Sequence, residues 1–157
     1  MKTLTLNDRL ILTYPDRFQV LDEAERKKLN FIEEGPGEVL KDPEGHMIIS
    51  IGFKAPGGLV SAILSVKDAA RNMETSIQKA MQPYGYKKNE SVTKDVGGEK
   101  AEGICYEYQA QDIEMYGETY VVKYDKAFYY PNYYTRKELK LENQKIWDEI
   151  LASAAWL

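Results

Sequence analysis

The chain is poor in the residues that build catalytic and metal centres. It has one cysteine, Cys105, and one histidine, His46, among 157 residues. A single cysteine excludes an intramolecular disulfide and is typical of a reducing compartment. A single histidine excludes zinc sites that use several imidazoles. The sequence therefore predicts a protein that folds around an apolar core without disulfide bonds or structural metal ions.

Excess positive charge and long apolar runs are also lacking. The formal net charge is -4, and the basic clusters are short and flanked by acids, so we predict no nucleic-acid partner. No apolar run approaches the roughly 20 residues that a helix needs to cross a bilayer. The first residues do not form the apolar core of a signal peptide. We therefore predict no membrane span and a cytoplasmic location.

Sequence motifs for cofactors and catalysis are absent too. The glycines match neither phosphate-binding pattern, and no nucleophile elbow occurs. Asp42, Glu44 and His46 are the nearest group of metal-ligand types, but residues 41–45 read as a turn with solvated acids. Cys105 and His46 could act together only if the fold joins them, and a cysteine in a strand usually behaves as a small buried hydrophobe. We predict no cofactor, no metal and no catalytic residue.

The N-terminal half alternates strand and helix signals. Residues 4–6 and 10–13 predict a hairpin around Asn7 and Asp8, and residues 18–21 continue as strand. Asp22 and Glu25 form a capping-box pattern that opens a short helix through residue 29. Residues 46–53 alternate as a central strand does. The run 59–65 is assigned to a helix, and the apolar spacing over 66–81 predicts a longer one.

The C-terminal half predicts a meander and a closing helix. Residues 86–96, 101–110 and 117–125 read as strands, and short connections make them antiparallel neighbours. The closing helix should bury one face, formed by Ile146, Trp147, Ile150, Leu151, Ala154 and Leu157. The sequence thus predicts one α+β domain over residues 1–157, with an antiparallel sheet beneath helices.

Two short motifs carry a family resemblance. The Tyr14-Pro15-x-x-Phe18 step and a closing helix with Ile150-Leu151-x-Ser153 resemble the superfamily of photosystem II PsbP, the Ran-binding factor Mog and bacterial DcrB-like proteins. The resemblance implies an α/β/α sandwich with a central antiparallel sheet flanked by helices. It also implies roles that are mostly non-enzymatic: docking on larger assemblies, GTPase binding or adaptor work. No functional residue of the superfamily matches a position here.

The most unusual stretch places five aromatic rings within residues 128–134. Rigid amphipathic rings beside an arginine favour a recognition surface. The same rings could instead cover a sheet face or form a homodimer contact, with Pro131 at an edge position or bulge. The candidate surface residues are Phe128, Tyr129, Tyr130, Tyr133, Tyr134 and Arg136.

Two function classes follow from these patterns. The first is a non-enzymatic protein-binding or adaptor domain whose interface with an unknown protein partner includes the aromatic segment. The alternative is a small-molecule-binding protein or enzyme with a pocket between sheet and helix. That pocket should be a closed cavity of about 300 Å³ or more with convergent polar groups. Its candidate lining is Tyr106, Tyr108, Tyr120 and Tyr124.

Overall fold

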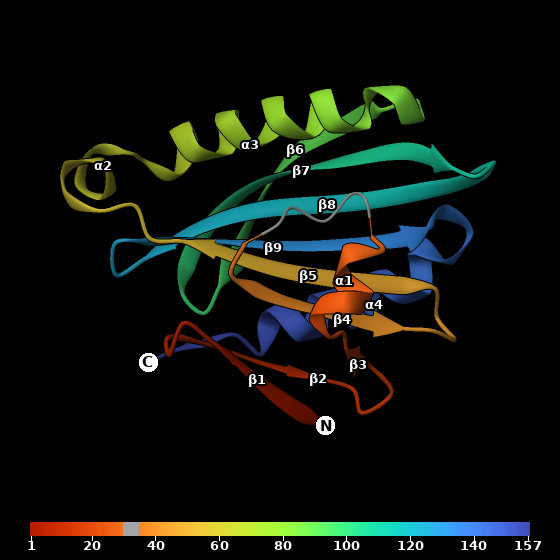
Figure 1. The fold of residues 1–157 in the computed structure, drawn as a ribbon, viewed down its shortest axis with the longest axis horizontal. Coiled ribbons are helices and arrows are strands. Elements are labelled where there is room, and N and C mark those ends of the chain that lie inside the picture. Colours follow the sequence, from red (N-terminus) through yellow and green to blue (C-terminus); the bar gives the residue numbers. More distant parts are fainter. Residues whose placement is uncertain (30–34) are drawn as a thin grey trace.

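A seven-stranded antiparallel sheet forms the centre of the molecule (Figure 1). The computed structural model describes residues 1–29 and 35–157. From one edge to the other, the strands are β3 (Gln19–Val20), β4 (Gly37–Asp42), β5 (Met47–Lys54), β9 (Ala127–Arg136), β8 (Ile113–Tyr124), β7 (Glu99–Ala110) and β6 (Lys87–Val96). The predicted α+β class and its antiparallel sheet are confirmed.

Two-residue turns join the four long strands β6 to β9. The turn residues Gly97–Gly98, Gln111–Asp112 and Asp125–Lys126 all have positive φ. Positive φ at both central residues is the geometry of hairpin turns whose twist matches that of the flanking strands. The predicted meander is confirmed. The predicted strands 101–110 and 117–125 leave too long a connection between them, because a two-residue turn suffices and β8 already begins at Ile113.

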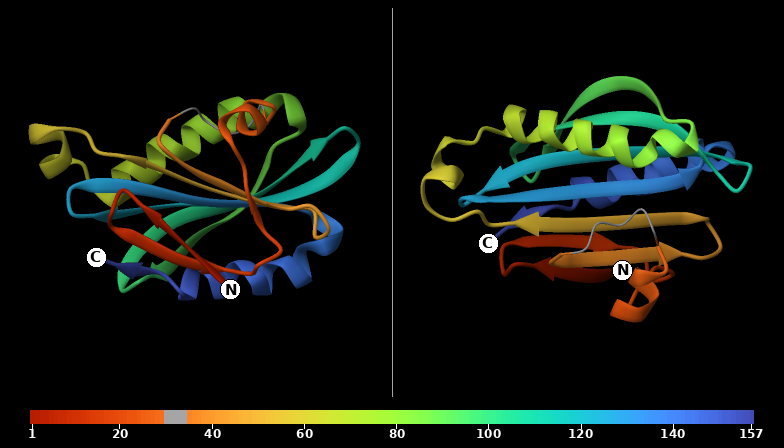
Figure 2. Two further views of the ribbon diagram at one scale, coloured as in Figure 1. Left: turned by 60° about the horizontal axis from the view of Figure 1, so that its bottom comes forward. Right: turned by 45° about the horizontal axis from the view of Figure 1, so that its top comes forward.

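Helices and a small second sheet cover the two faces of the large sheet (Figure 2). Helix α3 (Val66–Met81) covers one face and buries Ala69 and Met73. Helix α4 (Lys140–Ala152) covers the other face and buries Trp147 and Ile150. Both buried helical faces agree with the predicted spacing. The predicted sandwich is therefore confirmed, and the small sheet completes the α4 layer.

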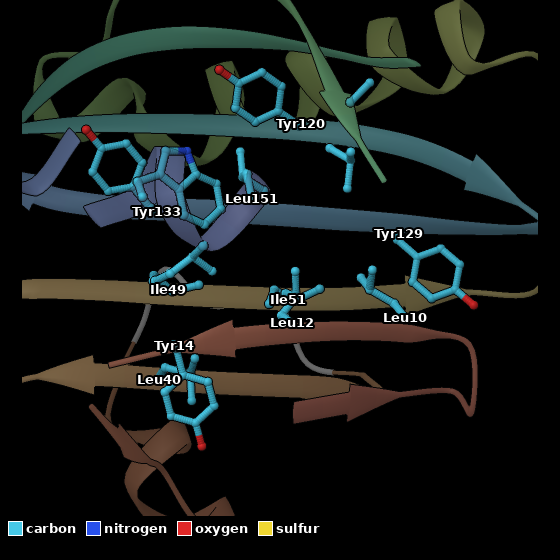
Figure 3. Close-up of a cluster of buried hydrophobic side chains, with 14 of the residues drawn as sticks. Leu10, Leu12, Tyr14, Leu40, Ile49, Ile51, Tyr120, Tyr129, Tyr133 and Leu151 are labelled. Carbon is cyan, nitrogen blue, oxygen red and sulfur yellow. The ribbon is translucent and has the colours of Figure 1, made fainter. Parts of the chain in front are cut away.

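The small sheet contains strands from both ends of the chain. Strands β1 (Lys2–Leu6) and β2 (Leu10–Tyr14) form the predicted hairpin, with Asn7 and Asp8 at positive φ. Strand β10 (Ala155–Trp156) pairs with the other side of β2. Figure 3 shows how Leu10 and Leu12 of β2 reach the core that Ile49 and Ile51 of β5 share with Leu151.

The end of the chain differs from the predicted helix. Helix α4 ends at Ala152, and Ser153 caps it: its N–H still donates to the Glu149 carbonyl, while its hydroxyl exchanges hydrogen bonds with the backbone of Thr13 in β2. The next residues form β10, where the Trp156 indole donates to the Val96 carbonyl at 2.9 Å. Ala154 and Leu157 therefore do not extend the helical face, and Leu157 is exposed.

Strand β9 lies inside the sheet, between β5 and β8. The prediction of an edge position for Pro131 is therefore wrong. Pro131 pairs with Ile51 of β5, and the register with β8 passes from Thr119–Asn132 to Val122–Tyr129 without shifting. The missing N–H of proline thus coincides with a gap in the β8 ladder, which is how an interior strand accommodates it.

The short elements between β3 and α3 hold one further correction. Helix α1 (Glu23–Lys27) has the predicted capping box. Strand β4 was not predicted, and it ends at Asp42, which is only 1% exposed rather than solvated. The Asp42 carboxylate accepts from Arg17 Nε at 2.7 Å and from the Gly45 N–H at 3.1 Å. Burial is possible because both oxygens find donors.

Candidate binding surfaces at helix α2 and strand β6

The aromatic segment lies mainly in the core. Phe128, Tyr129, Tyr133 and Tyr134 are at most 7% exposed, while Tyr130 and Arg136 are half-buried. The prediction of a surface made by these six residues is therefore wrong for four of them. The physical reason is the central place of β9, which puts a covering layer over each of its faces. Tyr133, for example, stacks on Trp147 of α4 with ring centroids 5.1 Å apart.

The four tyrosines of the alternative pocket do not meet. Tyr106 and Tyr108 pack on the α3 side with Met81, whereas Tyr120 belongs to the cluster on the α4 side. Paired residues on adjacent strands face the same side of the sheet, and side chains alternate between the two sides along each strand. Tyr120 pairs with Gly103, so it faces the side opposite to Tyr106 and Tyr108. Tyr124 stacks on Trp156 at 4.4 Å, at the edge of the α4 side. A pocket lined by all four rings is therefore excluded.

A buried carboxylate organises the polar contacts beneath α4. Glu118 is 3% exposed and accepts from the hydroxyls of Tyr116 and Tyr120, each at 2.7 Å. Burial is the main cause that raises the pKa of both tyrosines; contact with Cys105 and then Glu118 adds to it at Tyr116, and the charge of Glu118 adds to it at Tyr120. Both therefore stay protonated as donors. Lys94 Nζ approaches the carboxylate at 3.8 Å. This network satisfies its own charges and stabilises the core.

The single thiol and the single imidazole lie apart. Cys105 is in β7 and His46 is in the turn before β5, with β8 and β9 between those strands. Burial raises the pKa of the Cys105 thiol to about 11, which keeps it protonated and weakly nucleophilic. The Asp42 carboxylate is held by Arg17, and residues 1–29 and 35–157 contain no cluster of three metal-ligating side chains.

Helix α2 (Gly58–Ile63) turns its apolar side outward. Leu59, Val60 and Ile63 are 76%, 55% and 72% exposed, whereas Ser61 between them is buried. A surface helix normally buries its apolar stripe and exposes its polar one. The helix projects beyond the end of the sheet, at the left of Figure 1. Clustered apolar exposure of this kind marks an interaction surface.

Polar contacts lock this reversed orientation. The Ser61 hydroxyl donates to the Pro56 carbonyl at 2.7 Å and lies 3.1 Å from the Lys126 carbonyl in the β8–β9 turn. Lys123 Nζ donates to the carbonyls of Ser61 at 2.6 Å and Leu64 at 3.1 Å. Rotating the helix about its axis to bury its apolar side would break these hydrogen bonds and take both carbonyl acceptors away from Lys123. The apolar side chains are therefore held in place facing outward.

Charges of both signs lie near α2. Residues 53–67 contain two lysines, Lys54 and Lys67, and both are exposed. Lys126 is exposed in the turn that anchors the helix. Glu99 and Glu102 share a hollow with Lys67, and Asp68 is paired with Arg71.

Two adjoining hollows lie along α3, beginning at its N-terminal end. Their volumes are about 280 and 350 Å³, and both are lined by Lys67 and Glu102. Ala70 and Met73 of α3 and Ile104 of β7 give the first hollow apolar walls. Charged side chains of both signs complete the lining, namely Arg71, Glu74, Glu99, Lys100 and Lys123. Together they form a groove that lies between α3 and the strands β6 and β7 at the first hollow, and between the start of α3 and the strands β7 and β8 at the second.

Strand β6 is the open edge beside this groove. It pairs with β7 on one side and is the last strand of the sheet. Its residues 87–91 are all exposed, and Ser91 also lines the groove. A bulge between Lys88 and Glu90 disrupts one end, while residues 90–96 keep a regular register. An unpaired regular edge is a template for another strand.

Comparisons with known proteins identify the architecture. No family model and no curated protein matches the sequence. The solution structure of cyanobacterial PsbP (CyanoP) from Synechocystis sp. PCC 6803 aligns with a TM-score of 0.72, at 12% identity, over 99% of this chain and 92% of that one. The chain has a PsbP-like fold. The fold expected from the Tyr-Pro-x-x-Phe step and the closing helix is therefore confirmed.

Other PsbP-like structures are similar over nearly the whole chain. LpqN of Mycobacterium tuberculosis, described as involved in cell envelope biogenesis, has a TM-score of 0.63 at 14% identity, covering 94% of this chain and 82% of LpqN. PA94 of Pseudomonas aeruginosa, a protein of unknown function described as a putative regulator, has a TM-score of 0.53 at 15% identity, covering 95% and 92%. At these identities the likeness concerns the fold alone.

Sequence reasoning missed both surfaces of this PsbP-like domain. One signal for α2 was available: the run Leu59–Leu64 is bounded by Gly57–Gly58 and Ser65 and is too short to cross a core. The open edge at β6 depends on strand order, which no local pattern encodes. Across the described residues, no helix is both long enough and apolar enough to span a bilayer.

Proposed function

We propose that this chain is a non-enzymatic protein-binding domain that holds an extended segment of a partner protein along β6. The observation that carries the proposal is the open, regular edge of β6 over residues 90–95, which adjoins a hollow with apolar walls at Ser91. Main-chain hydrogen bonds to an edge strand supply affinity, and neighbouring pockets select side chains. The groove supplies such pockets on the α3 side of the edge.

The chemistry of the groove supports a peptide rather than a small metabolite. Its two hollows adjoin lengthwise, and their walls alternate apolar side chains with charges of both signs. A small-molecule site is usually one concave cavity that buries most of the ligand. An extended segment instead needs a series of shallow places beside an edge. The first hollow, of about 280 Å³, lies beside the edge at Ser91, and the second, of about 350 Å³, continues it toward β8.

The test compares variants that fill the groove with one that does not. Ser91→Arg and Ala70→Arg each place a long cation in the first hollow. Ser76→Arg places the same side chain on the opposite flank of α3, where Ser76 is exposed. The immobilised full chain and each variant are used to capture proteins from an extract of the source cells, and the captured proteins are quantified by mass spectrometry.

The expected result is a partner that wild type and Ser76→Arg retain and that both groove variants lose. Amide hydrogen exchange of the captured complex should then show new protection at residues 90–96. An identical set of captured proteins for all four chains would overturn the proposal, as would protection confined to another surface. The circular dichroism and melting temperature of each variant confirm that it is folded before capture is compared.

A further inference from the structure

The open edge of β6 is complementary to itself. Residues 90–94 have the sequence Glu-Ser-Val-Thr-Lys, with one charge of each sign at equal distances from Val92. An antiparallel neighbour runs in the reverse order, so a second copy centred on Val92 would place its Lys94 opposite Glu90. The same pair would occur twice, because a two-fold axis through the centre relates the two copies.

The geometry of an antiparallel ladder excludes half of the other registers. Side chains alternate between the two faces of a sheet, and residues that oppose each other lie on the same face. Two identical strands can therefore pair only with a residue at their centre, never with the middle of a peptide bond there. The choice is thus limited to centres on single residues of the regular segment 90–95.

Charge selects one of these centres. A centre on any charged residue of the segment would place identical charges opposite each other. A centre on Ser91 would extend into the bulge and oppose Lys88 to Lys94. A centre on Thr93 would oppose no two charges. Within residues 90–95, the centre on Val92 is the one that opposes charges of opposite sign without opposing like charges.

The side chains of this register suit each other on the α4 side of the sheet. Glu90 and Lys94 face that side, because their partners in β7, Cys105 and Ala101, belong to its core. Val92 lies between them and already packs against the same core. Two copies of Val92 would meet at the axis, with an ion pair on each side. Cross-strand pairs of these kinds stabilise a sheet.

The charges of the edge are available for such a contact. Glu90 is exposed and has no ion-pair partner among residues 1–29 and 35–157. Lys94 Nζ contacts the Asp148 carboxylate and lies 3.8 Å from that of Glu118. A lysine ammonium has three donors, and the Lys94 side chain is 24% exposed, so it can also bind Glu90 of a second copy.

We propose that two copies of this chain pair along β6, antiparallel about Val92, and join their large sheets into one. The inference rests on the proposed function in one respect: the second copy occupies the edge that a partner segment would use, so the two compete. Natural proteins protect open sheet edges against uncontrolled pairing. A two-fold pair closes both β6 edges at once and cannot grow further there.

The first test measures the mass of the purified full chain by sedimentation at rising concentration. Wild type should pass from monomer to dimer. Glu90→Lys places a lysine opposite Lys94 of the other copy at both sites, so it should raise the Kd of the dimer at least about tenfold. The control Glu44→Lys makes the same charge change at an exposed position in the β4–β5 turn and should dimerise as wild type does.

The second test determines the register with two exposed positions. About Val92, Ser91 of one copy lies opposite Thr93 of the other, whereas two Ser91 or two Thr93 residues lie diagonally, roughly 7–8 Å apart. A disulfide needs Cβ atoms within about 4.5 Å. Mild oxidation should therefore link an equal mixture of Ser91→Cys and Thr93→Cys and leave each variant alone unlinked. Cys105 is buried and should stay free.

Three results would overturn the inference. They are a wild-type chain that stays monomeric at every concentration, a dimer that Glu90→Lys does not weaken, and disulfide formation by one cysteine variant alone as readily as by the mixture. Circular dichroism confirms that each variant is folded.

The dimer and the peptide groove can be tested apart. Ala70→Arg fills the first hollow from α3 and leaves the edge of β6 unchanged, so it should lose the partner protein and still dimerise. Failure to capture a partner therefore leaves the dimer intact as an inference. A wild-type chain that is always monomeric leaves the proposed peptide groove intact.

Discussion

Replacing Gly117 with alanine tests whether the tyrosines on the α3 side are packed without a pocket. Gly117 lies in the middle of β8, opposite Tyr106 of β7. A Cβ atom at this position would lie 2.8 Å from Tyr106 Cζ and 2.9 Å from its Cε2 and hydroxyl oxygen. These distances are shorter than real Cβ atoms adopt, so the ring must move.

The cost follows from how little room the ring has. Tyr106 is fully buried, and its hydroxyl shares a hydrogen bond of 3.2 Å with the Thr119 hydroxyl. Overpacking a filled core costs about 1–3 kcal/mol. Displacing the ring also breaks the hydrogen bond, at about 0.5–1.5 kcal/mol. We therefore expect Gly117→Ala to lower the free energy of unfolding by about 2–4 kcal/mol.

The assay is urea unfolding followed by tryptophan fluorescence, with calorimetry as a second measurement. A loss of about 3 kcal/mol corresponds to a fall of about 6–12 °C in melting temperature for a chain of this length. Gly52→Ala is the matched control in β5, because among residues 1–29 and 35–157 its Cβ would meet only the Pro36 carbonyl at 3.7 Å, an ordinary contact. It should change stability by less than about 0.5 kcal/mol.

Equal stabilities of Gly117→Ala and Gly52→Ala would refute the reasoning. They would show that the Tyr106 ring can move aside without cost, as it could beside an internal cavity. A ligand pocket at this ring would then become plausible again. A double variant, Gly117→Ala with Tyr106→Leu, adds a further check. Its loss of unfolding free energy should be smaller than the sum of the losses of the two single variants, because leucine removes the clashing atoms.

Three further predictions concern other groups. Burial raises the pKa of the Cys105 thiol from 9.0 to about 11. The stability that the buried neutral thiol contributes is therefore fully present below pH 9 and is lost as the pH rises through 11. Relative to Cys105→Ala, wild type should lose about 3 kcal/mol of unfolding free energy between pH 8 and pH 12. Asp42→Asn removes the charge that Arg17 Nε binds at 2.7 Å and should cost about 2–3 kcal/mol in urea unfolding, and no change would contradict its structural role. Ser61→Ala frees α2 from the β8–β9 turn and should speed hydrogen exchange of the α2 amides at least about fivefold, whereas unchanged exchange would show that the hydroxyl does not anchor the helix.

Local signals predicted the regular elements well because their causes are local. The capping box at Asp22 satisfies a helix N–H group within four residues. The apolar spacing of α3 and α4 matches the faces that they bury. Asn7 and Asp8 tolerate positive φ and therefore fix the first hairpin. Strand β4 escaped prediction because Glu38, Lys41 and Asp42 interrupt its apolar pattern.

The candidate site could not be predicted because it depends on strand order. The rings of β9 have the composition of an interface, and only their place between β5 and β8 makes them core. The exposure of Leu59 and Ile63 likewise depends on contacts with Lys123 and Lys126, about sixty residues away in sequence. The same pattern of residue types can lie in a core or on an exposed surface. The order of the strands decides which of the two occurs.

The central claim is that the tyrosine-rich strand is core and that the apolar side of α2 faces solvent. Hydroxyl-radical footprinting of the full chain, read by mass spectrometry, tests both parts in one measurement. We expect strong oxidation of Leu59 and Ile63 and almost none of Tyr129 and Tyr133, which are fully buried. Strong oxidation of those two tyrosines, with protection of Leu59 and Ile63, would contradict the account.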